Sequence, residues 1–192
     1  MTGNIDEAIL KLHQALSLRK KFPEAHFNLG NALLNKGDWQ AAIAEYSEAL
    51  RLKPDFLGAR NNIGVALLQG GDADGAIAKY HEVLHLKPDS WVAHVGLGIA
   101  LLKKGDRERA IAELREALRL RSDQWQVYIH LGNALHDNGQ NDEAAAECKK
   151  ALALNPNLPK SDWCPGTSER YGGSGRSVRN RCEKVERTFL RG

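Results

Sequence analysis

The chain has 192 residues, of which 27 are Lys or Arg and 24 are Asp or Glu, so its formal net charge is +3. Its uninterrupted apolar runs fall far short of the roughly 20 residues that cross a bilayer, and no basic-then-apolar leader follows Met1. Three cysteines neither cluster at metal-ligand spacing nor form an even set for disulfides, which favours a reducing compartment. We therefore expect a soluble cytoplasmic protein with no membrane segment.

The first segment of the chain, residues 1–22, is predicted to be a single helix. Its apolar residues Ala8, Leu12 and Ala15 recur at the spacing of one helical face. Gly3 aligns with the turn glycines of the repeats that follow, so this helix corresponds to the second half of a unit. We expect part of its apolar face to lie uncovered. An engineered fragment, a misplaced start and a natural capping helix are alternative explanations.

Four units of 34 residues follow without a gap over residues 23–158. Each unit contains a Leu-Gly or Ile-Gly pair, a turn glycine, and an alanine twelve residues after the first glycine. Proline marks the end of three of the four units. The predicted units are 23–56, 57–90, 91–124 and 125–158.

Each unit is predicted to hold two helices joined at the turn glycine, because proline and glycine interrupt the apolar periodicity at those points. The first helices are expected over 24–36, 58–70, 92–104 and 126–138, and the second over 40–52, 74–86, 108–120 and 142–154. Short acceptor side chains next to the breaks can cap the free amides of the following helix. We expect Asp38, Asp72 and Asp106 to cap second helices, and Asp55, Asp89, Asp123 and Asn157 to cap first helices.

Glycine inside the first helix of every unit calls for a compensating gain, because it costs about 0.5 to 1 kcal/mol relative to alanine in a helix interior. We expect the helix-interior glycines to face the alanines of the second helix and to let the paired helices touch. Larger residues are expected to fill the gaps between units. The glycines are Gly30, Gly64, Gly98 and Gly132, the alanines Ala42, Ala76, Ala110 and Ala144, and the larger residues Tyr46, Tyr80, Leu114 and Cys148.

This pattern resembles the tetratricopeptide repeat, a helix-turn-helix unit of the same period, over residues 3–158. The resemblance implies an all-α fold, a right-handed solenoid of antiparallel helix pairs. In such superhelices the first helices line a concave groove, which is the usual binding surface of repeat proteins.

The tail, residues 159–192, departs from the repeat and is basic and glycine-rich. It is interpreted either as a disordered segment, such as unrelated coding sequence, or as a degenerate capping helix over 177–190. Its arginines could contact nucleic acid, but without interleaved aromatic residues a nucleic-acid partner is not expected.

No catalytic site is predicted. The segment His81-Glu82-Val83-Leu84-His85 matches the zinc motif H-E-x-x-H, but its histidines are expected to project from a solvated face without a third ligand or a cleft. Cys148 occupies a packing position and is expected to be an inert buried thiol. We therefore expect no enzyme activity, no metal site and no cofactor.

The resemblance places one set of side chains in the groove. They are Phe27, Asn28, Asn31, Asn35, Asn61, Asn62, Val95, Ile99, Lys103, His130 and Asn133. Asparagine offers both a donor and an acceptor and could hold the backbone of an extended peptide. Asn28 and Asn62 resemble the asparagine ladder of O-linked N-acetylglucosamine transferase, although Gly96 and His130 interrupt it. The carboxylate clamp of chaperone-binding relatives is not expected, since its basic residues are missing.

The sequence thus predicts a non-catalytic scaffold that binds an extended peptide or a partner helix in its groove. One alternative is the substrate-recruiting part of a larger enzyme, such as a glycosyltransferase. Another is a self-assembling module, that is, a homo-oligomer. A further interpretation is that the groove asparagines are solvated, or bond one helix to another, and bind nothing specific.

Overall fold

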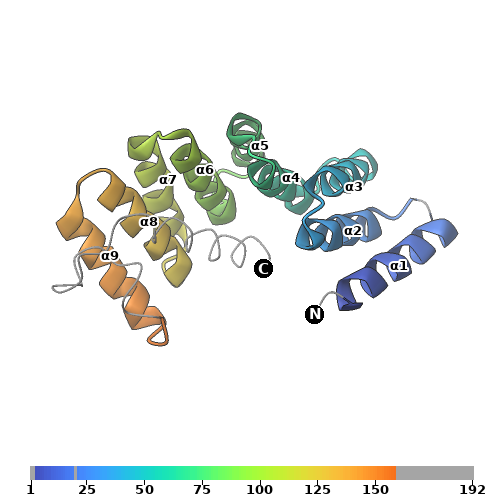
Figure 1. Ribbon diagram of the computed structural model, residues 1–192. Coiled ribbons are helices and arrows are strands. Elements are labelled where there is room, and N and C mark those ends of the chain that lie inside the picture. The colour runs from blue at the N-terminus through green and yellow to red at the C-terminus, as the bar shows by residue number, and fades with distance from the viewer. Residues whose placement is uncertain (1–2, 20, 159–192) are drawn as a thin grey trace. The chain divides into compact units, whose positions relative to one another are not determined.

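The computed structural model describes residues 3–19 and 21–158, and all regular secondary structure within these ranges is α-helical (Figure 1). Helix α1 spans Gly3–Leu18. Four helix pairs follow: α2 (Pro23–Lys36) with α3 (Trp39–Leu52), α4 (Leu57–Gln69) with α5 (Ala73–Leu86), α6 (Trp91–Lys104) with α7 (Arg107–Leu120), and α8 (Trp125–Asp137) with α9 (Asn141–Leu154). The predicted all-α class is confirmed, and each predicted boundary in the pairs lies within one residue of the observed one.

Each pair turns at a glycine whose backbone has a positive φ angle, a conformation that only a residue without a β-carbon adopts readily. Gly37, Gly71, Gly105 and Gly139 have φ angles of 95°, 85°, 87° and 82°. After Gly37, the amide of Asp38 donates to the carbonyl of Leu33 at 3.0 Å, which closes the end of α2. The turn thus reverses the chain and satisfies the helix end at the same time.

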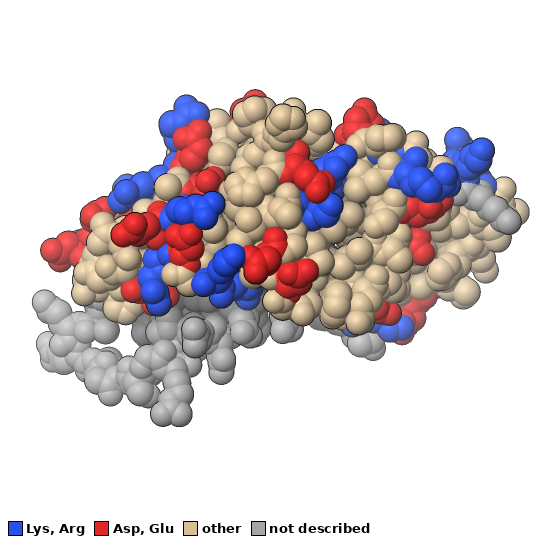
Figure 2. Space-filling model, turned by 90° about the horizontal axis from the view of Figure 1, so that it is seen from above, with Lys and Arg blue, Asp and Glu red and all other residues tan. Residues whose placement is uncertain are grey.

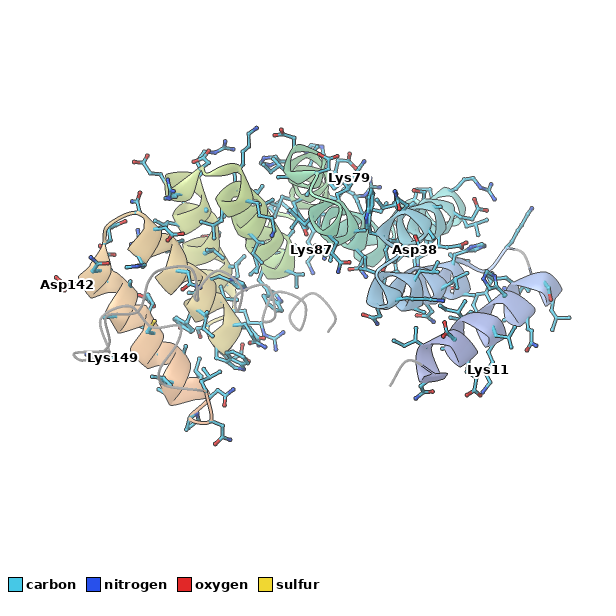
Figure 3. All side chains as sticks on the ribbon, viewed as in Figure 1. Lys11, Asp38, Lys79, Lys87, Asp142 and Lys149 are labelled. Atoms are coloured by element: carbon cyan, nitrogen blue, oxygen red, sulfur yellow. The ribbon has the colours of Figure 1, made fainter. Side chains whose placement is uncertain are left out.

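The aspartates after these glycines cap the second helices as predicted. The carboxylate of Asp38 accepts from the amide of Ala41 at 3.1 Å, and Asp72 does the same for Gly75 at 2.8 Å. Asp106 accepts from the amide of Arg109 at 3.3 Å. Asp38 lies at the turn where α3 begins (Figure 3). These bonds satisfy amides that have no partner within the helix.

The predicted caps of the first helices are wrong. The N-cap residues of α4, α6 and α8 are Phe56, Ser90 and Gln124, and none makes a side-chain cap bond. Each aspartate lies one residue before the cap position, and Asp123 instead accepts from Arg121 Nε at 2.9 Å. The helix that Asn157 would cap falls outside the described residues, as do the tail segment 159–192 and its two interpretations.

The described helices fall into two compact units, one up to Pro88 and one from Asp89 onward. In the first unit α1 packs on α2, α2 on α3, α3 on α4 and α4 on α5. In the second unit α6 packs on α7, α7 on α8 and α8 on α9. Helix α3 is therefore shared between α2 and α4, and α7 between α6 and α8, which is the packing of a helical repeat.

The helix-interior glycines make room for one side chain of the partner helix. A β-carbon on Gly30 would lie 2.5 Å from the Tyr46 ring, and one on Gly64 would lie 2.8 Å from the Tyr80 ring. A β-carbon on Gly98 would lie 2.8 Å from Leu114 Cγ, and one on Gly132 would lie 3.3 Å from Cys148 Sγ.

The expected contact between glycine and alanine is confirmed in the last two pairs. Gly98 and Gly132 approach the carbonyl oxygens of Ala110 and Ala144, each at 3.4 Å from a built β-carbon. In the first two pairs the atoms nearest to the glycine belong to the tyrosine ring. The residues that were expected to fill gaps between units therefore fill the space opposite the glycine of their own pair.

Charged side chains of both signs are interspersed on the face shown in Figure 2, where the described residues form no extended region of a single sign. Some charged side chains of the described residues are paired along one helix, such as Arg51 with Glu48 and Arg119 with Glu116. None of the described helices combines the length and the apolar character that a membrane-crossing segment needs.

Candidate functional site

Two predicted groove residues, Asn31 on α2 and Asn62 on α4, are bonded to each other in the first compact unit. Asn62 Nδ2 donates to Asn31 Oδ1 at 2.8 Å. The hydroxyl of Tyr46 on α3 donates to the same oxygen, also at 2.8 Å. The Tyr46 side chain is fully buried, and burial raises the pKa of its hydroxyl above the ordinary value, so it remains a donor.

This arrangement fixes the direction of both amides. Because Asn31 Oδ1 accepts two hydrogen bonds, the Nδ2 group of Asn31 points away from Tyr46 with its two N–H groups. Asn62 uses Nδ2 toward Asn31, so its Oδ1 remains an acceptor. Neither atom makes a further hydrogen bond within the described part of the chain. The pair thus presents one donor from α2 and one acceptor from α4, and we call it the amide pair.

Two further asparagines lie on the same face of α2 as Asn31. Asn28 precedes it by three residues and Asn35 follows it by four, and helical residues at these spacings are neighbours. Both side chains are exposed, whereas Asn31 and Asn62 are half-buried. This face of α2 therefore carries three amides in a row.

Phe27 and Asn61 occupy equivalent positions in the first and second repeats but have different surroundings. The Phe27 ring packs against Tyr46 and Phe56, with centroid separations of 5.8 and 4.8 Å. Asn61 Oδ1 is buried and has no hydrogen-bond partner within the described residues. Phe27 thus contributes to packing, and Asn61 carries an unused acceptor.

The predicted residues of the second compact unit are mostly buried. Val95 is 0% exposed, Ile99 1% and His130 3%, whereas Lys103 is exposed and Asn133 half-buried. Burial, together with the positive charge of Lys103, lowers the pKa of His130 from 6.5 to about 4, so the imidazole is neutral at pH 7. A ligand could contact Val95 or Ile99 only if these side chains were uncovered.

Comparison of the two units explains why the amide pair occurs in only one of them. The residues 68 positions after Asn31, Tyr46 and Asn62 are Ile99, Leu114 and His130. Two of the three hydrogen-bonding groups are thus replaced by apolar side chains. Within the described residues, the structure joins Asn31, Asn62 and their neighbours into one polar site and gives the second unit no equivalent.

Tyr46 is the residue of this site that sequence reasoning missed. It occupies a packing position, and Tyr80 fills the same position one repeat later with a buried hydroxyl that lacks a partner in the described residues. The sequence signal for the bond was that Tyr46 and Asn31 occur in the same repeat. In the next repeat the tyrosine position holds Tyr80, but Val65 replaces the asparagine. A tyrosine at this position therefore did not by itself indicate a polar role.

No group of three or more His, Cys, Asp or Glu side chains within the described ranges could hold a metal ion. Cys148, which was expected to be buried, is 0% exposed. Together with Ile129 and Ala151 it forms an apolar cluster against which Trp125 and Leu158 pack.

Comparisons with known proteins agree with this architecture. The tetratricopeptide repeat family model matches residues 2–55, 27–90 and 95–159. The structure of MamA 41-end from Desulfovibrio magneticus RS-1 is similar, with a TM-score of 0.71 and 26% identity over 81% of this chain and 88% of that one.

Two further solved structures share the fold. A MamA crystal structure has a TM-score of 0.69 and 23% identity, covering 80% of this chain and 90% of that one. YrrB has a TM-score of 0.63 and 17% identity, covering 81% and 80%. Among curated protein sequences no significant relative was found. Because the family model matches most of its length, the chain belongs to the tetratricopeptide repeat family.

Proposed function

We propose that this chain is a non-catalytic protein-interaction scaffold that binds an extended peptide across α2 and α4. The amide pair carries the proposal. Asn31 Nδ2 is a donor and Asn62 Oδ1 an acceptor, and the bond of 2.8 Å between the two residues holds them side by side. A peptide group offers one acceptor and one donor, so the pair is complementary to the backbone of a ligand.

The surroundings of the amide pair favour binding through backbone groups. Asn28 and Asn35 extend the row of amides along α2 and are exposed. The hydrogen bond from Tyr46 fixes the orientation of Asn31 before a ligand arrives, which reduces the entropy lost on binding. Neutral amides demand little of the ligand's side chains, so we expect a broad sequence preference.

The comparisons support an interaction role in general terms. YrrB is described as a TPR protein with an unusual peptide-binding site. The asparagine ladder that Asn28 and Asn62 resemble in O-linked N-acetylglucosamine transferase fits the same mode of binding. Since Gly96 and the buried His130 interrupt that ladder, we confine peptide binding to the first compact unit. We also propose that the protein is located in the cytoplasm.

The other partners remain predictions from the sequence. Self-assembly and recruitment of substrate for a larger enzyme are both compatible with a repeat scaffold, but no contact within the described residues favours either over peptide binding. The predicted contributions of Lys103 and Asn133 on the second unit also stay predictions.

A peptide library tests the proposal. Peptides selected on the wild-type protein should lose affinity for Asn28→Ala/Asn62→Ala, because both changes remove groups that bond the peptide backbone. The expected loss is about tenfold or more, the equivalent of one or two hydrogen bonds. Isothermal titration calorimetry gives the dissociation constants.

Gln40→Ala/Ser47→Ala on α3 is the control, because it also removes two polar side chains from the same compact unit, both of them exposed and outside the proposed site. It should bind the selected peptides as the wild type does. Unchanged binding to the Asn28→Ala/Asn62→Ala variant would contradict the proposed site.

A further inference from the structure

Two histidines on α5, His81 and His85, lie one helical turn apart. Both side chains are exposed, and residues at this spacing lie on the same face with β-carbons about 5 to 6 Å apart. The chain has seven histidines, and this is the single pair among them separated by four positions. Neither imidazole makes a hydrogen bond or ion pair within the described part of the chain, so their nitrogens are available to a ligand.

The glutamate between them does not act as the base of a zinc hydrolase. Glu82 Oε1 accepts from Lys79 Nζ at 2.7 Å, and its Oε2 accepts from Arg60 Nη1 at 2.8 Å. The hydrogen bond from Lys79, followed by that from Arg60, lowers the pKa of this carboxyl. Glu82 therefore serves the internal packing of α4 and α5, and the motif has no general base to offer.

The ion pairs of Glu82 do not supply a ligand to a metal ion. Arg60 and Lys79 each carry a positive charge and share this one carboxylate, so a cation at the histidines must be held by the imidazoles themselves. Ala78, one turn before His81, is exposed and small, so it does not obstruct the outer side of the pair. Lys79 is labelled on α5 in Figure 3.

We propose that His81 and His85 form a two-ligand surface site for a late first-row divalent cation such as Ni²⁺, Cu²⁺ or Zn²⁺. Neutral imidazole is a preferred ligand of these ions, and a helix presents both rings at the distance that one ion can bridge. Water fills the remaining coordination positions. The site exists only when α5 is helical, so the ion stabilises the folded unit by binding it in preference to the unfolded chain.

The test uses Ni²⁺ and the full chain with its accessible thiols alkylated, so that cysteine does not compete for the metal. Ni²⁺ should raise the thermal unfolding midpoint of the wild type, and calorimetry should show a site that His85→Ala weakens more than about tenfold.

A matched variant separates spacing from histidine content. His85→Ala/Leu86→His keeps seven histidines but places them five residues apart, and Leu86 is already exposed, so the fold is not disturbed. It should lose the Ni²⁺ effect, whereas His85→Ala/Ala78→His, with a pair three residues apart, should regain it. His136→Ala should behave as the wild type. No shift in the wild type, or an equal shift in all variants, would overturn the proposal.

Discussion

The ring of Tyr46 lies so close to Gly30 that a β-carbon built on the glycine would come 2.5 Å from ring atom Cε1. Atoms do not approach this closely, so the glycine is required by the tyrosine of the paired helix. The corresponding distance is 2.8 Å for Gly64 facing Tyr80 and for Gly98 facing Leu114, and 3.3 Å between Gly132 and Cys148 Sγ. Each glycine position therefore has its own tolerance for a side chain.

We predict that Gly30→Ala destabilises the protein by about 1 to 3 kcal/mol through overpacking. Gly132→Ala should be close to neutral, because the small clash with Cys148 is offset by the higher helix propensity of alanine, about 0.5 to 1 kcal/mol. Urea denaturation of the two variants measures the difference. Equal stabilities would show that the glycine in the first pair is not held by Tyr46.

Asn31→Ala should cost about 1 to 3 kcal/mol, since it leaves the buried Tyr46 hydroxyl without its acceptor. Asn28→Ala, on the same helix face but exposed, should change stability by less than about 0.5 kcal/mol. Tyr46→Phe in the Asn31→Ala background should recover part of the loss. A double-mutant cycle of Tyr46 and Asn31 without coupling energy would contradict the bond.

Asp38→Ala should cost about 1 kcal/mol, because the carboxylate caps the amide of Ala41. Asp55→Ala is the matched control, an exposed aspartate beside the next helix whose cap position belongs to Phe56. Its stability should stay within about 0.5 kcal/mol of the wild type. Thermal unfolding followed by circular dichroism distinguishes the two outcomes.

Stability should fall in acid through His130. Its pKa in the folded state is about 4, below the ordinary 6.5, so the fold favours the neutral ring. The full contribution is present above pH 6.5 and is lost as the pH falls from 6.5 toward 4, up to about 3 kcal/mol. His130→Asn should flatten this part of the curve. An unchanged slope in the variant would assign the acid sensitivity to other groups.

The repeat pattern predicted the helices well because its signals are local. Turn glycines, prolines and the aspartates after the turns act through the backbone of a few neighbouring residues, so Asp38 could be assigned as a cap. Asp55 failed because capping depends on a register of one residue: it would be the N-cap only if α4 began at Phe56, whereas α4 begins at Leu57.

The candidate site was harder to predict because it depends on contacts between helices. The face of α2 could be found from spacing alone, but the orientation of Asn31 is set by Tyr46, fifteen residues away. Pairings also change from one repeat to the next. His26 contacts Glu45 at 2.7 Å and His94 contacts Glu113 at 2.7 Å, whereas Arg60 at the equivalent position contacts Glu82. Such changes of pairing partner involve two or three sequence positions at once, so they cannot be recognised from any single position.

The most direct measurement of the central claim is a backbone N-methylation scan of a selected peptide against the wild type and Asn62→Ala. If Asn62 Oδ1 accepts a hydrogen bond from the peptide backbone, one methylated position should weaken binding to the wild type by about tenfold and leave the variant almost unaffected. Equal losses in both proteins at every position would contradict recognition of the backbone by the amide pair.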